Sequence, residues 1–445
     1  MKKFFVLLII AILSIFFFLL SKQGNELFKP YISTYIENQL EENISVEIQK
    51  LQIDINEIKL TAILNHKTAI KAQAQISLFE KDIINNIQID LPKTEIKELL
   101  AISNQPLYAK GKANIHIETP TLKDWKIEAK SEIKLYDILL NKEVLKKALN
   151  IDIPANTKIN GILNIEKNRD ILTSNGKIQS NLADLNFDLA KYNYKTHKLD
   201  SDYYIKISDL SKFKYLIKQK LYGLLEMNGS IHKDKMLIVT GRTNSLDGIV
   251  DFKLIDNHIK AEIFDISVEK LIRVFHYPQI FNAKLIGTLN YNLKKEKGII
   301  DAKLNNARLL PNQLTTLIKN IKGLDLTKES YNQTTFIGNI DKNNIKFNLN
   351  AKSKTTTLSL KDATMNKRTE KIDTKYTIKI GEQDISGEIK GSINNPKVTI
   401  DSSKFIEHKI LNGISKYIKN GSLEDFGIGE KEQKAIKDTF FELFK

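Results

Sequence analysis

The most regular feature of this sequence is an alternation of apolar and polar residues, which begins near Ile44 and continues to about Ile400. Between Trp125 and Leu135 every second residue is apolar or small, and Lys and Glu occupy most positions between them. Successive side chains of a β-strand point to opposite faces of its sheet, so each such strand has one apolar and one charged face. The pattern predicts a mainly β protein.

A unit of strand, Asp, helix, loop, Gly and strand occurs four times along this body. The Asp-to-Gly separations are 21, 24, 20 and 22 residues, in the pairs Asp90–Gly111, Asp137–Gly161, Asp209–Gly229 and Asp265–Gly287. Such repeats bury their apolar faces by stacking on their neighbours. We therefore expect an elongated, twisted, repeating β-sheet groove, with each Gly at a bend or a close backbone approach.

Short helices are expected between the strands, several of them behind an Asp or Ser that suits the N-cap position. Their predicted ranges are Lys93–Ile102, Ile138–Leu149, Ser211–Tyr222, Val268–His276 and Asn312–Ile321.

The two ends of the chain differ from the body. Residues 1–22 contain an uncharged run of seventeen residues, about 25 Å long as a helix, which predicts a single transmembrane anchor. Lys2 and Lys3 keep the amino terminus cytoplasmic and direct the bulk of a bacterial inner-membrane protein to the periplasm. A cleaved signal peptide is the alternative. We expect a membrane-proximal helix in residues 23–43, the β body in 44–402, and capping helices in 403–445.

Composition narrows the function classes. The net charge of +15 comes almost entirely from Lys, interleaved with Asp, Glu and Asn, so we expect no nucleic-acid partner. The sequence contains no Cys, and its seven His are scattered without metal-ligand spacing. No phosphate loop or nucleophile elbow is present. We therefore expect no enzyme, and no catalytic residue, metal or cofactor.

The segment Ile385–Asp401 carries a strand, a Gly-x-Ile-x-Asn-Pro motif that contains Gly391, Asn395 and Pro396, and a final short strand. It resembles the closing segment of AsmA-like proteins, the AsmA and TamB type of repeating β-groove envelope proteins. The resemblance covers residues 1–55 in layout and about 200–401 in motif. It implies an inner-membrane anchor, a periplasmic groove with an apolar floor, and a role in phospholipid transport between the inner and outer membranes and in envelope integrity.

On this interpretation, phospholipids of the inner membrane are the expected partners, together with outer-membrane or envelope proteins. Aliphatic and aromatic residues on the alternating strands are the candidate groove lining: Trp125, Ile127, Ile133, Leu135, Leu289, Tyr291 and Leu293. Alternation does not distinguish an open groove from a face filled by the chain's own side chains. The alternative function is therefore a non-transporting periplasmic scaffold, or an assembly factor for outer-membrane proteins.

Overall fold

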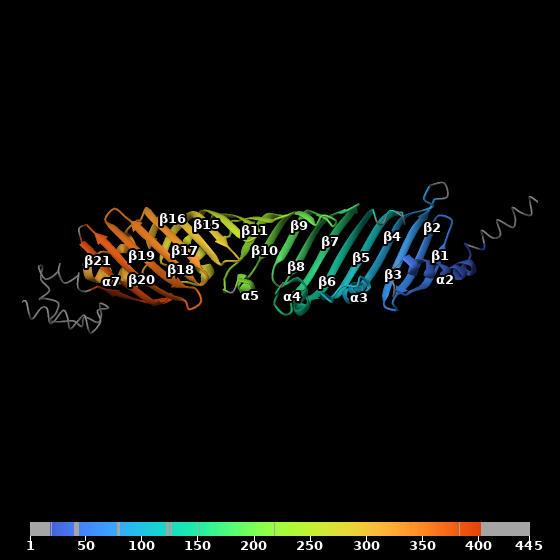
Figure 1. Cartoon of the computed structure of the whole chain (residues 1–445), viewed down its shortest axis with the longest axis horizontal. Helices are drawn as coiled ribbons and strands as arrows, with labels where there is room; N and C mark the ends of the chain where they lie inside the picture. Colours follow the sequence, from blue (N-terminus) through green and yellow to red (C-terminus); the bar gives the residue numbers. More distant parts are fainter. Residues whose placement is uncertain are drawn as a thin grey trace, which may run out of the picture. The chain divides into compact units, whose positions relative to one another are not determined.

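The computed structural model describes residues 18, 20–39, 44–77, 81–121, 124, 127–150, 152–217, 219–381 and 383–401. They form 22 antiparallel β-strands with short helices between some of them, which confirms the predicted mainly β class (Figure 1). Among these residues no helix combines the length and apolarity needed to cross a bilayer. The predicted anchor falls almost entirely, and the predicted carboxy-terminal helices entirely, outside the described ranges.

The chain divides into two compact units, which are described separately. The first unit extends to Ile207 and includes Ser230–Lys235. Its strands pair in sequence order from β1 to β10. They are β1 (Val46–Ile53), β2 (Glu57–Leu64), β3 (Thr68–Ile76), β4 (Ile84–Glu95), β5 (Ala109–Thr121), β6 (Glu128–Leu140), β7 (Lys158–Asn168), β8 (Ile171–Ser180), β9 (Asp184–Asn193) and β10 (Lys198–Ile207).

The helices of the first unit are α2 (Lys22–Gln39), α3 (Ile96–Ile102) and α4 (Lys142–Leu149). α3 and α4 lie at the same edge of the sheet, at the lower strand ends in Figure 1. α2 packs Phe28, Ile32 and Ile36 against buried side chains of β1 and β2. This helix begins one residue before the predicted membrane-proximal range of 23–43, and Pro30 lies inside it.

The second unit contains Ser208–Gly229 and the chain from Met236 onward. β11 (Leu225–Lys233) contains residues of both units, and from β12 to β22 each strand pairs with the next. These strands are β12 (Leu237–Thr243), β13 (Ile249–Ile255), β14 (His258–Ser267), β15 (Phe281–Asn292), β16 (Lys297–Leu309), β17 (Gln333–Asp341), β18 (Asn344–Lys352), β19 (Thr356–Asn366), β20 (Lys371–Ile380), β21 (Gln383–Ser392) and β22 (Asn395–Ile400). The helices are η2 (Leu210–Phe213), α5 (Lys214–Ile217), α6 (Val268–Phe275), α7 (Gln313–Lys322) and η3 (Leu326–Lys328).

The four repeat glycines lie where another backbone comes close. A Cβ on Gly161 would stand 2.7 Å from the carbonyl oxygen of Lys177, and one on Gly111 would stand 2.9 Å from that of Asp137. Gly229 and Gly287 face backbone oxygens of their neighbouring strands more closely still. The predicted close approach is therefore confirmed at all four positions, because any side chain there would collide with main-chain atoms.

The repeat Asp residues have a more varied role than capping. Asp209 caps η2 by accepting from the Ser211 N–H at 2.9 Å, as expected. Asp137 and Asp265 instead have positive φ, 49° and 56°, next to register shifts in β6 and β14. The caps of the helices that follow are Asn141 and Ser267.

These bulges explain why two predicted helices begin too early. β4 continues to Glu95 past a bulge with Lys93 at φ 49°, and β6 continues to Leu140 past Asp137. A bulge adds one residue to a strand without ending the pairing, so the break in alternation resembles a helix start. α6 and α7 match their predicted positions within a residue or two, whereas the range predicted from Ser211 to Tyr222 holds only η2 and α5.

Candidate functional site

The inner face of the first unit is defined by two rows of side chains that continue from strand to strand in register. The first row crosses β4 to β10 through Leu91, Ile115, Ile133, Leu163, Gly176, Phe187 and Tyr203. The second row crosses the same strands through Thr94, Ala113, Leu135, Gly161, Ile178, Leu185 and Ile205. Neither row contains a charged residue, so together they form an uncharged, mostly apolar strip.

The strip is long enough to cover a lipid acyl chain. Adjacent strands are about 4.8 Å apart, so the seven strands from β4 to β10 extend over about 30 Å. The hydrocarbon core of a bilayer is about 30 Å thick for two leaflets, so one acyl chain needs about half that length. Either row therefore exceeds the length of one acyl chain.

The opposite face of the same strands is polar. Lys130 pairs with Glu166 of the next strand at 3.0 Å, and Lys134 lies 2.6 Å from Glu132. His116 lies between two carboxylates, with Nδ1 2.7 Å from Asp90 and Nε2 3.2 Å from Glu118. These hydrogen bonds, the one to Asp90 foremost, raise the pKa of the His116 imidazole.

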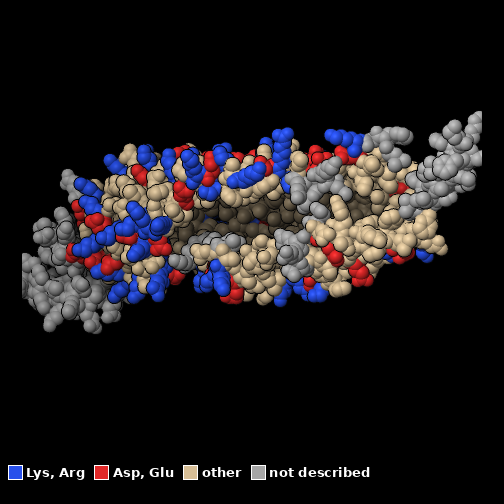
Figure 2. Space-filling model, turned by 45° about the vertical axis from the view of Figure 1, so that its right-hand side comes forward, with Lys and Arg blue, Asp and Glu red and all other residues tan. Residues whose placement is uncertain are grey.

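Most side chains of the two rows are only half-buried. Leu91, Ala113 and Gly176 are buried, whereas Ile133, Leu163 and Phe187 retain part of their surface. The clusters of buried apolar side chains lie elsewhere, between α2 and β1–β2 and in the second unit. In the space-filling view of Figure 2, a hollow lined mostly by residues other than Lys, Arg, Asp and Glu opens toward the viewer, and charged side chains gather along its upper side.

The predicted lining residues of the first unit have different positions. Ile133 and Leu135 belong to the first and second row respectively. Ile127 precedes β6 and is 49% exposed, so it does not point into an interior, because the ladder begins only at Glu128. Trp125 lies outside the described residues.

In the second unit, Leu289 pairs with Ala261 and Ile300, and Tyr291 pairs with Ile259 and Gly298. Both side chains are half-buried on the apolar face of β15, and burial raises the pKa of Tyr291. Leu293 follows the end of β15 and is 43% exposed. The structure therefore brings Leu289 and Tyr291 together on one face and leaves Leu293 at the strand end.

Two aromatic residues of the first row were not singled out from the sequence. Phe187 and Tyr203 face each other across β9 and β10, and burial raises the pKa of the Tyr203 phenol. The alternating runs Leu185–Phe187 and Tyr203–Ile205–Ile207 contain the signal that would have found them.

The carboxy-terminal motif forms the hairpin of β21 and β22. Gly391, with φ 109°, pairs with Pro396, and Asn395 pairs with Ser392. The Gln313 side-chain amide of α7 donates to the Asn395 side-chain oxygen at 3.2 Å. The motif therefore has a structural role, because it joins the last hairpin to the helix that covers it.

Within the described ranges, no three His, Asp or Glu side chains are placed to hold a metal ion. A scan of protein-family models and searches of curated proteins and solved structures gave no match to this chain. The geometry of the inner face therefore carries the functional argument.

Proposed function

We propose that this chain is an AsmA-like envelope protein whose inner face shields the acyl chains of phospholipids. An inner-membrane anchor would hold it with its bulk in the periplasm, where it supports phospholipid movement between the inner and outer membranes and envelope integrity. One observation carries the proposal. The two rows of β4–β10 are uncharged, mostly apolar and in register, yet most of their side chains are only half-buried.

The energetics favour a hydrocarbon occupant. Each acyl CH₂ exposed to water costs about 0.8 kcal/mol, so a diacyl lipid does not cross an aqueous space unshielded. An apolar strip with a polar outer face lowers this cost while the headgroup stays in water. The excess of Lys over acidic residues adds a general attraction to anionic lipid surfaces.

Photo-crosslinking in living cells tests the proposal with a matched pair of positions. A photo-reactive amino acid at Leu163, on the inner face, should form an adduct with phosphorus-labelled lipid. The same residue at Asn164, which is exposed on the outer face, should not. Leu289 and Asn290 provide a second pair in the other unit.

The scaffold alternative predicts a different result. If the inner positions form no lipid adduct in a folded, membrane-associated chain, the transport proposal is wrong and a periplasmic scaffold or assembly factor explains the fold better. Export-reporter fusions after Asn43 and at the carboxy terminus test the topology separately. Both should report the periplasm.

A further inference from the structure

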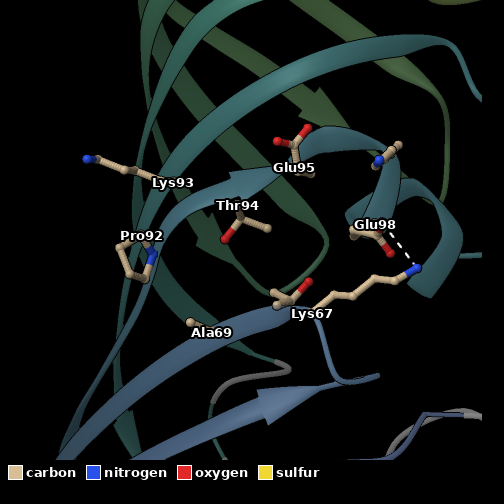
Figure 3. Close-up of a pocket in the computed structure, with 9 residues that line it drawn as sticks. Lys67, Ala69, Pro92, Lys93, Thr94, Glu95 and Glu98 are labelled. Carbon is tan, nitrogen blue, oxygen red and sulfur yellow. Dashed lines mark ion pairs between the residues drawn. The ribbon is translucent and has the colours of Figure 1, made fainter.

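A pocket of about 320 Å³ lies in the first unit, where β3 begins and β4 leads into α3 (Figure 3). Its lining includes three Lys, two Glu and two Thr side chains. Thr94 connects it to the inner face, because this residue is the first member of the second row and pairs with Ala113. The pocket is therefore a polar site at the end of an apolar row.

The Thr94 hydroxyl is buried and has no partner. The residue is 4% exposed, and its Oγ1 makes no hydrogen bond within the protein. The bulge at Lys93 places Thr94 there, and the Lys93 N–H is satisfied by the Asn114 side chain at 2.7 Å. Leaving a buried hydroxyl unpaired costs about 1–3 kcal/mol, so this position favours a ligand or a water that bonds to it.

An ion pair of opposite charges lies across the pocket from this hydroxyl in Figure 3. The Lys67 Nζ stands 3.8 Å from the Glu98 carboxylate, and in Figure 3 both side chains lie on the far side of the pocket from Pro92. Glu98 is the more enclosed of the two, with 18% of its side chain exposed against 67% for Lys67. Glu95 turns away from this group and lies 3.9 Å from Lys112. A hydroxyl, an ammonium and a carboxylate therefore share one pocket.

We propose that this pocket binds the headgroup of an amine-bearing phospholipid. The Thr94 hydroxyl and the Lys67 ammonium donate hydrogen bonds to the phosphate, and the Glu98 carboxylate accepts from the headgroup ammonium. The acyl chains continue along the second row past Ala113 and Leu135. The inference rests on the proposed function, because it needs the inner face to hold those chains.

The test compares three lipids with identical acyl chains: phosphatidylethanolamine, phosphatidylglycerol and diacylglycerol. The full chain in detergent is equilibrated with equal amounts of each, washed, and its retained lipid is measured by mass spectrometry. We expect about tenfold preference for phosphatidylethanolamine over diacylglycerol, because hydrogen bonds to charged groups contribute this much. Thr94→Val should reduce that preference severalfold, because Lys67 and Glu98 remain, and Glu98→Gln should lower phosphatidylethanolamine to the phosphatidylglycerol level. Lys71→Gln, on an exposed position of β3, is the control and should change nothing.

Each outcome has a distinct meaning. Thr94→Val removes an unpartnered hydroxyl and nearly preserves the volume of the side chain, so the variant should fold. If the variant binds the three lipids as the unchanged protein does, the cavity holds only water and the inference is wrong. Equal retention of all three lipids would overturn it while leaving the acyl-chain proposal intact. If the chain retains none of the three lipids, both the headgroup inference and the acyl-chain proposal are wrong. Lipid-free binding of inorganic phosphate that is lost in Thr94→Val would assign the pocket to free phosphate and overturn the headgroup assignment.

Discussion

The apolar faces of β4–β10 in the first unit and of β16–β21 in the second are built from the same alternating pattern, but they are buried to very different degrees. In the second unit Ala351, Tyr376 and Ile378 are at most 1% exposed, and they belong to a continuous cluster. In the first unit Ile133 and Leu163 remain half-buried on equivalent inward positions. The pattern of a strand therefore sets the polarity of its faces, and another part of the chain decides whether the apolar face is covered.

The covering element in the second unit is the segment between β16 and β17. α7 contributes Leu314, Leu317 and Ile318 to the buried cluster, and η3 adds Leu326, which is 0% exposed. The helix is held at its start by a capping box, in which Asn312 and Thr315 exchange hydrogen bonds. In the first unit α3 and α4 lie at the edge of the sheet instead (Figure 1). The apolar rows of the first unit thus stay half-buried, whereas α7 and η3 bury the apolar face of the second unit.

The largest expected effect is a loss of stability, and it tests whether the apolar face of the second unit is packed more tightly than that of the first. Ile378→Ala should lower the local free energy of unfolding by about 2–5 kcal/mol, because it leaves a cavity in a filled core. Ile133→Ala should cost clearly less, because its side chain is half-exposed and its removal leaves no closed cavity. Hydrogen exchange followed by mass spectrometry measures both, at the amides of β20 and β6. Equal losses would mean that the face of the first unit is as filled as that of the second.

The second prediction concerns a charge placed in the half-buried apolar rows of the first unit. Ile133→Glu should lower lipid adducts at Leu163 by about tenfold or more, since a buried carboxylate without a partner is costly beside hydrocarbon. Glu132→Lys changes the adjacent outward residue by two charges and should be nearly silent, as surface changes usually are. Adduct yield relative to folded protein is the measurement. If both variants behave alike, the assignment of the two faces is wrong.

A smaller effect tests the bulges that shape the first unit. The Asn160 side chain accepts from the Asp137 N–H at 2.8 Å across the β6–β7 ladder. Asn160→Ala should cost about 0.5–1.5 kcal/mol, because the bulged N–H then loses the side-chain oxygen that accepts from it. Asn164→Ala is the control, since Asn164 bonds only the side chain of Asn175 among the contacts we describe, at 2.9 Å. A larger loss from the control would contradict the structural role of the bulge cap.

Much of this fold can be predicted from the local sequence, but the positions of the β-bulges cannot. Alternation correctly separates Ile133 from Glu132, and the repeat spacing finds glycines such as Gly161 at close approaches. The sequence predicts helices that begin at Lys93 and Ile138, at or directly after the bulge residues Lys93 and Asp137, because a single added residue breaks the period of two in the same way as a change of structure. The Asn partners that satisfy these bulges lie on the next strand and have no local signature.

The candidate site is harder to predict for a related reason. The apolar character of Leu135 and Leu289 is visible in the sequence, but whether another element covers them depends on contacts between distant segments. Thr94 illustrates the limit. Its neighbours Pro92 and Lys93 suggest a solvent-exposed helix start, and only the register shift between Leu91 and Thr94 places its hydroxyl in a pocket. A polar headgroup site within an otherwise apolar face was therefore not expected.

The smallest expected effect comes from the outer face of the first unit. The imidazole of His116 is held between Asp90 and Glu118, and these contacts raise its pKa in the folded chain above the usual value near 6.5. A raised folded-state pKa means that the protonated ring stabilises the fold fully below the unfolded pKa. That contribution is lost as the pH rises through the folded pKa. Stability should therefore fall slightly from about pH 6 upward.

Denaturation midpoints at several pH values measure this effect, and His116→Gln should flatten the slope because Gln does not titrate. The change should be small, because the ring is 38% exposed and solvent screens its ion pairs. A small slope fits a unit whose stability comes from strand pairing and the inner rows rather than from its charged exterior. If the stability lost across this pH range were as large as the loss in Ile378→Ala, the polar face would contribute as much to the first unit as the filled core contributes to the second. A stability that rises with pH would contradict the raised pKa of His116.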